Sequence, residues 1–286
     1  MCLQISWRRS GTLLVWHNDN VDSNVVLKLK RLDYCLRWLG TAVSFALFGI
    51  GGILQGILIH PLIWLLVRNA ERRRDLSRQV VAGSMRLFIF IMRTLGVLVY
   101  EIQGREYIRS QEPCLILANH PSLIDVIFLF ALFPEANCIV KAAMARNPLF
   151  SVLIRSSGYI SNEDPVAMIV HATEALQRGE SLIVFPEGTR TQTGGQLEFH
   201  SGAAAIALRT GCTCLPVFIS CSPTTLTRQD KWYHVPDSRV RFIAAIQPPL
   251  DVSSLQGATR DKRAMTDRIN VYMQDYFRRG LESGSG

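Results

Sequence analysis

A histidine and an aspartate at the end of an apolar run have the types and spacing of a catalytic base and its orienting partner. The run CLILAN (residues 114–119) leads into His120, and Asp125 follows shortly after it. A histidine can accept a proton near neutral pH, and a carboxylate beside it can fix which ring nitrogen carries hydrogen. A simpler interpretation is a capping box, in which Ser122 and Asp125 satisfy backbone donors at a helix start. The two interpretations are compatible.

The same spacing occurs a second time at His17 and Asp22, so spacing alone does not identify a site. The surroundings of the two pairs differ. His120 ends a run that is typical of a buried strand, and ligands of α/β sheets bind at the carboxyl ends of strands. His17 lies in the polar stretch HNDNVD, which predicts no such element. We therefore expect chemistry at His120 and none at His17.

A second group of polar residues also follows a strand-like run. SLIVFPEGTR (residues 181–190) ends in Glu187, Gly188, Thr189 and Arg190. Pro-Glu-Gly alone is consistent with a structural turn in which Gly188 takes a positive φ. A carboxylate and a guanidinium at a strand end can also recognise a hydroxyl and a phosphate, because the planar guanidinium pairs with two phosphate oxygens.

The charge balance and the cysteines narrow the class of protein. The chain of 286 residues has 31 Lys and Arg against 23 Asp and Glu, a net charge of +8, with a mean hydropathy of +0.17. This balance favours an anionic partner, such as an acidic membrane surface or a phosphorylated substrate. Seven scattered cysteines have no zinc-site spacing, so we expect a reducing compartment and no metal site.

One long apolar block predicts attachment to a membrane. The stretch from Trp38 to Val67 contains no Asp, Glu, Lys or Arg, and it exceeds the roughly 20 residues that cross a bilayer. Gly51, Gly52 and Pro61 leave open both a single tilted span and a re-entrant helical hairpin. The block begins too late and is too long for a cleavable signal peptide.

Basic residues flank this block on both sides. The stronger cluster, RNAERRRDLSR (residues 68–78), favours contact with anionic headgroups rather than nucleic acid, and a cytoplasmic downstream domain. If the protein is bacterial, the membrane is then the inner membrane. Residues 84–99 carry Arg86 and Arg93 on an apolar pattern. They predict either an interfacial helix or a core helix with snorkelling arginines.

Beyond about residue 100, short apolar runs alternate with helical patterns, which is typical of an α/β domain. We expect a mixed, largely parallel sheet flanked by helices and preceded by an N-terminal membrane-embedded helical segment. The predicted strands are 98–103, 114–118, 138–141, 181–185, 214–219 and 239–246, and the predicted helices are 123–133, 147–156, 165–178, 199–210 and 259–279. The predicted division is a polar and basic segment 1–37, membrane-anchoring helices 38–99, the α/β domain 100–280 and a flexible tail 281–286.

Taken together, these motifs resemble those of the lysophospholipid acyltransferases, a family that includes the bacterial 1-acylglycerol-3-phosphate acyltransferases. NHPSLID resembles their His-x-x-x-x-Asp motif, and FPEGTR matches their acceptor motif residue for residue. The separation of about 65 residues is also typical of the family. Two further segments are also similar to the family: residues 141–160, in which Lys141 and Gly158 align, and residues 199–219. The likeness covers roughly residues 80–250.

The resemblance implies a fold of the glycerolipid acyltransferase kind and a role for each motif residue. His120 would be the general base and Asp125 its orienting partner. The acceptor would be held by the motif residues Glu187, Gly188, Thr189 and Arg190, with Lys141 as a further candidate. The resemblance also implies an acyl thioester donor, acyl-CoA or acyl carrier protein, and no metal or other cofactor.

Two positions depart from the family pattern. In the family an arginine commonly follows the Gly-x-Ile segment, whereas this chain continues after Ile160 with Ser-Asn-Glu-Asp (residues 161–164). His200 stands where the family often has lysine. Both departures weaken the expectation of a phosphomonoester acceptor, because cations are lost and acids lie nearby.

The sequence therefore predicts a membrane-attached O-acyltransferase that acylates lysophosphatidate in phospholipid biosynthesis. An alternative is the same chemistry on another lysolipid or on a specialised lipid acceptor. Thioester hydrolysis and a non-catalytic lipid-binding module are less favoured, the latter because the pair of His120 and Asp125 is intact.

Overall fold

A seven-stranded sheet forms the centre of the molecule, in the order β1-β7-β6-β2-β5-β3-β4. The computed structural model describes residues 23–109, 113–191, 197–252 and 261–283. Neighbouring strands run parallel, except that β6 pairs with β7 in the antiparallel sense. The strands are β1 (Leu98–Gln103), β2 (Leu115–Ala118), β3 (Asn137–Val140), β4 (Ile160–Ser161), β5 (Leu182–Val184), β6 (Cys214–Ser222) and β7 (Val240–Ile246). The predicted fold class, a mixed and largely parallel sheet flanked by helices, is confirmed.

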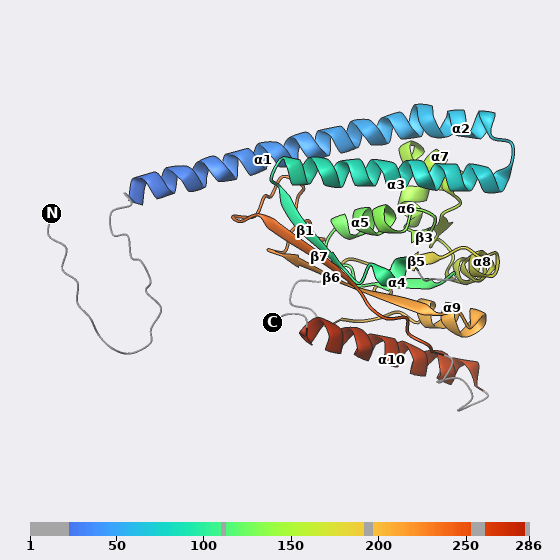
Figure 1. The fold of residues 1–286 in the computed structure, drawn as a ribbon. Coiled ribbons are helices and arrows are strands. Elements are labelled where there is room, and N and C mark those ends of the chain that lie inside the picture. Colours follow the sequence, from blue (N-terminus) through green and yellow to red (C-terminus); the bar gives the residue numbers. More distant parts are fainter. Residues whose placement is uncertain (1–22, 110–112, 192–196, 253–260, 284–286) are drawn as a thin grey trace, which may run out of the picture.

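Helices cover both faces of this sheet (Figure 1). One face carries α3 (Ala70–Thr94), α5 (Ile124–Leu132) and α7 (Pro148–Ser157), and the other carries α8 (Pro165–Gln177), α9 (Gly202–Thr210) and α10 (Lys262–Ser283). Strand β2 shows why both faces are filled. Its residues point alternately into the two cores, and all four are fully buried. A strand buried on both faces reads as a continuous apolar run rather than an alternating one.

The N-terminal helices form an outer layer over α3 (Figure 1). Helix α1 (Ser23–Leu54) continues through a π-helical turn, η1 (Gln55–Ile59), into α2 (His60–Leu66). The chain reverses only after α2, and Asn69 caps the returning α3 by accepting the backbone N–H of Arg72 at 2.9 Å. The glycines and proline of the apolar block do not reverse the chain.

The interfacial or core helix expected at residues 84–99 has different bounds. Helix α3 begins at Ala70, inside the basic cluster, and ends at Thr94, because β1 starts at Leu98. The two arginines of the expected segment both have partners: Arg86 donates to the carbonyl of Ala131, and Arg93 lies over the ring of Tyr100. One face of α3 is core, while Leu87 and Phe90 remain exposed.

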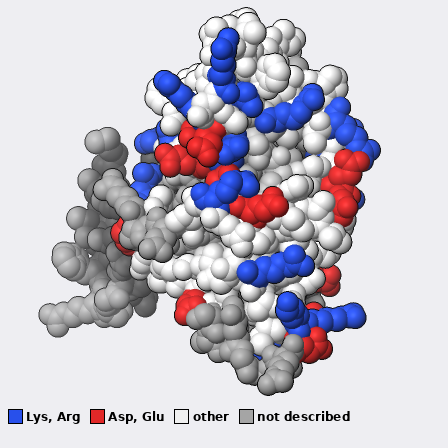
Figure 2. All heavy atoms as spheres, turned by 90° about the vertical axis from the view of Figure 1, so that its right-hand side faces the viewer, with Lys and Arg blue, Asp and Glu red and all other residues white. Residues whose placement is uncertain are grey.

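The outer layer buries several polar side chains and exposes many apolar ones. Thr41, Ser44 and His60 are buried, whereas Leu47, Ile50 and Leu65 belong to a long exposed apolar face. Within the described residues, one helix, Leu27–Leu66, is long and apolar enough to cross a membrane by length and composition, with a mean hydropathy of 2.0. Figure 2 shows a largely uncharged top, with Lys and Arg side chains gathered at and below its margin.

Three short elements were not predicted. They are α4 (Glu106–Arg109), α6 (Ala142–Arg146) and β4. Each is too short to establish a hydrophobic period in the sequence. The other predicted strands and helices of the α/β region are present, with bounds that differ by a few residues.

Candidate active site

His120 and Asp125 are in direct contact. His120 follows the carboxyl end of β2, Asp125 lies in the first turn of α5, and the His120 Nδ1 is 2.9 Å from the Asp125 Oδ2. The same Oδ2 accepts the backbone N–H of Ser122 at 2.7 Å. The carboxylate half of the capping box is thus present together with the histidine contact. The Ser122 hydroxyl donates elsewhere, to the carbonyl of Thr225 at 2.8 Å.

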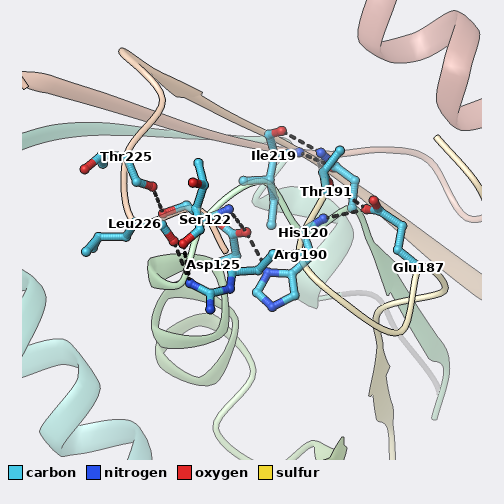
Figure 3. Close-up of polar contacts among 11 residues, drawn as sticks. His120, Ser122, Asp125, Glu187, Arg190, Thr191, Ile219, Thr225 and Leu226 are labelled. Carbon is cyan, nitrogen blue, oxygen red and sulfur yellow. Dashed lines mark hydrogen bonds and ion pairs between the residues drawn. The ribbon is translucent and has the colours of Figure 1, made fainter. Parts of the chain in front are cut away.

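Burial governs the electrostatics of this pair. The side chain of Asp125 is fully buried, and burial raises its pKa to about 6, while the contact with His120 acts in the opposite direction. The ring of His120 is stacked on Phe185, with centroids 4.2 Å apart, and it lines a cavity of about 480 Å³. With Nδ1 directed at Asp125, Nε2 is the ring nitrogen left for another partner (Figure 3).

Glu187 connects the second motif to the first. Its Oε1 accepts the backbone N–H of His120 at 2.9 Å and the Thr191 hydroxyl at 2.9 Å. The backbone N–H of Thr191 donates in turn to the carbonyl of His120 at 2.8 Å. Glu187 is buried, and burial raises its pKa. The carboxylate therefore holds the histidine loop in place through the backbone.

Gly188 meets a steric requirement of the same turn. Its φ is +64°, and a Cβ at this position would lie 3.0 Å from the Cδ2 of His200. The left-handed conformation and the close ring both favour glycine. The backbone N–H of His200 donates to the carbonyl of Pro186 at 2.8 Å, and the His200 side chain lines the cavity. Thr189 is half-buried and is not among the described residues that line the cavity.

Arg190 has backbone partners that its sequence did not indicate. Its Nη1 donates to the carbonyls of Leu226 and Thr227, each at 2.8 Å. Figure 3 shows the guanidinium directed toward this segment of the chain. The side chain also lines the cavity. Arg190 thus fastens the segment that follows β6 and still borders the space in front of His120.

The two acids that follow Ile160, Glu163 and Asp164, have partners within the protein. Asp164 caps α8 by accepting the backbone N–H groups of Val166 and Ala167. Glu163 forms an exposed ion pair with Arg146 at 2.6 Å. Neither acid lines the cavity, whose described lining includes Lys141 and Arg190 and no Asp or Glu. The expected repulsion of an anionic acceptor by these two acids is therefore absent from the described lining.

Two supporting contacts were missed from the sequence. The side chain of Asn119 exchanges two hydrogen bonds with the backbone of Ile219, at 2.7 and 2.8 Å, which fixes the end of β2 against β6. The Phe185 ring that stacks on His120 was read only as part of a strand. A polar residue at the end of an apolar run was the available signal for Asn119. His17 and Asp22 lie outside the described residues. Within the described part of the chain, no group of three or more His, Cys, Asp or Glu side chains is placed to hold a metal ion.

Known proteins with similar sequences point to one family. The acyltransferase family model matches residues 99–220. The 1-acyl-sn-glycerol-3-phosphate acyltransferase of Pseudomonas aeruginosa is 29% identical over 146 residues, which cover 49% of this chain and 56% of that protein. The enzyme of the same name from Cocos nucifera is 32% identical over 198 residues, covering 64% of this chain and 61% of that protein.

A solved structure agrees with the fold. The crystal structure of the 1-acyl-sn-glycerophosphate acyltransferase of Thermotoga maritima aligns with a TM-score of 0.63 at 21% identity, covering 87% of this chain and 97% of that one. The chain spans little more than half the length of these two curated relatives. The resemblance predicted from the two motifs is confirmed: residues 99–220 match the acyltransferase family model, and the chain is similar to curated 1-acyl-sn-glycerol-3-phosphate acyltransferases.

Proposed function

We propose that this protein transfers a fatty acyl group from an acyl thioester to the free hydroxyl of lysophosphatidate, in glycerolipid synthesis. The observation that carries the proposal is the contact between the buried Asp125 carboxylate and Nδ1 of His120, at the wall of a 480 Å³ cavity. The names of the relatives support the same reaction class. The donor is acyl-CoA or acyl carrier protein.

The chemistry follows from the orientation of the histidine. Asp125 keeps the hydrogen of the neutral ring on Nδ1, which leaves Nε2 as the base. Nε2 takes the proton of the acceptor hydroxyl while the oxygen attacks the thioester carbonyl carbon. The carbon–sulfur bond then breaks, and the thiolate leaves with the proton returned by His120. The products are the acylated lipid and the free thiol, and the step needs no covalent enzyme intermediate.

The cavity suits both substrates. Lys141 and Arg190 supply positive charge for the acceptor phosphate, and Glu187 and Gly188 shape the turn beside it. The wall formed by α5, β3 and β5 is apolar, and it includes Val126, Phe130 and Val184, which suits an acyl chain. Burying such a chain is favourable by about 0.8 kcal/mol per CH₂ group.

We further propose that the protein works at a membrane, on its cytoplasmic face. The exposed apolar face of α1 and α2 and the basic residues below it support this location. A substrate with a long acyl chain is itself held in the bilayer. Attachment therefore brings the cavity to the acceptor rather than requiring the acceptor to leave the lipid.

Purified full-length protein, incubated with an acyl thioester and a panel of lysolipids, tests the proposal by the mass of the products. Phosphatidate formation that is lost in His120→Ala is the expected result. Release of free fatty acid without lipid product would identify a hydrolase instead. Binding of lipid with no turnover of any thioester would identify a lipid-binding module.

A second acceptor class has one observation in its favour. Because Nη1 of Arg190 is bonded to two backbone carbonyls, fewer of its donors are left for a phosphate. A lysolipid with a different headgroup would need fewer hydrogen bonds from this arginine. The same panel decides: strong turnover of a zwitterionic, amine-bearing or uncharged acceptor, with weak turnover of lysophosphatidate, would establish the second class.

A further inference from the structure

The segment that joins β6 to β7 connects the outer helix α1 with the candidate active site. Its far part, residues 228–236, is named here the aromatic loop. Arg37 of α1 is 3% exposed and donates to the carbonyls of Pro236 and Asp237. The ring centroid of Trp232 lies 5.9 Å from that of Phe45, which is about two helical turns beyond Arg37 on α1. In Figure 1 this connection lies directly beneath α1.

The tip of the aromatic loop exposes the side chains that favour a membrane–water interface. Trp232 is 49% exposed and Tyr233 is 40% exposed. Lys231 lies over the Tyr233 ring at 5.7 Å, and Arg228 is exposed. Trp and Tyr concentrate at the headgroup level of bilayers, where their rings are amphipathic, and Lys or Arg there meets anionic lipid.

Helix α1 exposes similar residues next to Arg37. Tyr34 and Trp38 are 38% and 44% exposed, and they flank Arg37, the residue that holds the loop. Trp38 also begins the charge-free block. Exposed aromatic side chains are therefore present both on α1, beside Arg37, and on the loop that Arg37 joins to this helix.

The near end of the same segment holds the candidate active site. The carbonyl of Leu226 accepts both the backbone N–H of Leu123, at 3.2 Å, and the Nη1 of Arg190, at 2.8 Å. Leu226 has a φ of +54°, a conformation that is costly for a residue with a branched side chain. Its side chain is buried and lines a small cavity together with Phe45 and Trp232.

We propose that the aromatic loop is a second membrane contact, which docks on the headgroup region of a bilayer that contains anionic lipid. The contact holds Leu226, and through its carbonyl it positions Arg190. This inference rests on the membrane attachment proposed above and extends it to a surface outside the apolar block. Leu226 is a positioning residue, because it acts through Arg190 and not on a substrate.

Tryptophan fluorescence of the full chain in vesicles tests the contact without measuring activity. The vesicles contain phosphatidylcholine and phosphatidylglycerol, with a share of brominated phospholipid as a quencher. The signal of Trp232 is the difference between wild type and Trp232→Phe, and that of Trp38 is obtained in the same way with Trp38→Phe. We expect both signals to be quenched by brominated lipid and shielded from acrylamide.

Comparison of the Trp232 and Trp38 signals distinguishes the loop contact from the membrane attachment proposed for α1. A quenched Trp38 with an unquenched, acrylamide-accessible Trp232 would overturn the loop contact and leave the proposed attachment standing. If neither signal is quenched, both ideas are wrong. Trp232 accessible to acrylamide only after the vesicles are removed would support the loop contact whatever the reaction proves to be.

The positioning part is tested by kinetics. Trp232→Ser with Tyr233→Ser should lower kcat/KM about tenfold for acceptor in anionic vesicles, and less than twofold for a soluble short-chain acceptor and donor. Val271→Ser is the matched control, since Val271 is 58% exposed on α10, across the sheet from α1. If kcat/KM falls equally for the vesicle-bound and the soluble substrates, the loop does not couple the active site to the membrane.

Discussion

The carboxylate of Glu187 accepts the backbone N–H of His120, across 67 positions of sequence. The two motifs are therefore one hydrogen-bonded unit, in which the second holds the loop that carries the first. Glu187 was expected to contact the acceptor. Its described contacts are with the protein, through His120 and Thr191.

Replacing Glu187 should therefore affect both rate and stability. Glu187→Ala leaves the His120 N–H and the Thr191 hydroxyl without their buried acceptor, which should cost about 1–3 kcal/mol in the free energy of unfolding. Glu187→Gln keeps an acceptor oxygen, so its losses of rate and of stability should both be smaller. Chemical denaturation and steady-state kinetics measure the two effects, with Glu174→Gln on the exposed side of α8 as control. Unchanged stability in Glu187→Ala would contradict this role.

His120→Ala should lower kcat by about 10²–10⁴, because the acceptor hydroxyl loses its base in the transition state. The melting temperature should change little, since the His120 ring borders a cavity rather than filling the core. His171, which is exposed and paired with Glu174, provides the control variant His171→Ala. His17→Ala should be silent as well. A folded His120→Ala protein with wild-type turnover would end the base hypothesis.

The pH dependence of activity and of stability should run in opposite directions at Asp125. Its pKa is raised to about 6 by burial, and orientation of His120 needs the ionised carboxylate. Activity should therefore rise with pH through an apparent pKa near 6, a value that belongs to the pair. A raised carboxyl pKa means that the folded state binds its proton more tightly than the unfolded state. The stability from this group is full below the unfolded pKa and is lost as the pH rises through about 6.

Asp125→Asn isolates this effect. The amide oxygen can still accept the N–H of Ser122, so the helix start remains capped. The variant should lose activity at every pH and should lose the decline in stability toward neutral pH. Denaturation midpoints and kcat/KM measured between pH 4 and pH 8 provide both readings. A variant that only melts earlier, at full activity, would mean that Asp125 is a helix cap and nothing more.

Arg190→Ala should reduce kcat/KM for lysophosphatidate by about one to two decades, because a charge-assisted hydrogen bond contributes about 1.5–3 kcal/mol. With monoacylglycerol as acceptor the loss should be much smaller. Part of the loss on any acceptor comes from the freed carbonyls of Leu226 and Thr227, so Lys141→Ala is the comparison, since Lys141 is exposed and borders the same cavity. Equal losses on both acceptors would show that Arg190 is structural only.

The full-length protein should remain with the membrane pellet after high salt and after alkaline carbonate. The exposed apolar face of α1 and α2, and not charge alone, is the expected cause. Arg72→Gln with Arg73→Gln should weaken binding to anionic vesicles by about 1 kcal/mol per arginine without releasing the protein from native membranes. Release by salt alone would show that the attachment is electrostatic.

The sequence predicted the sheet well because its central strands are buried on both faces. The runs that become β2 and β5 are continuous and apolar, and each ends in a polar motif. Strand β4 could not be predicted, because two residues have no period. Helix α3 was recognised only in its apolar second half. Its first turns were taken for a basic flank, although Asn69 stands before them as an N-cap.

The candidate site was predictable in its local part only. His120 and Asp125 are near in sequence, and a helix start at residue 124 brings them together. The contact of Arg190 with Leu226 is different, because it depends on a segment that has no motif and arrives from the far end of β6. A backbone carbonyl leaves no trace in the residue type that carries it, so composition and spacing could not reveal this partner.

Arg78 determines whether the N-terminal helices can be removed from the α/β domain. This buried α3 residue donates to the carbonyls of Glu135 and Ser157 and to the carboxylate of Glu180, thereby joining three separate parts of the α/β domain. A truncation that begins after residue 80 would expose those acceptors and uncover the core beneath α3. The N-terminal helices and the α/β domain should accordingly unfold in one transition, and we expect that a chain cut after residue 80 does not fold into a stable enzyme.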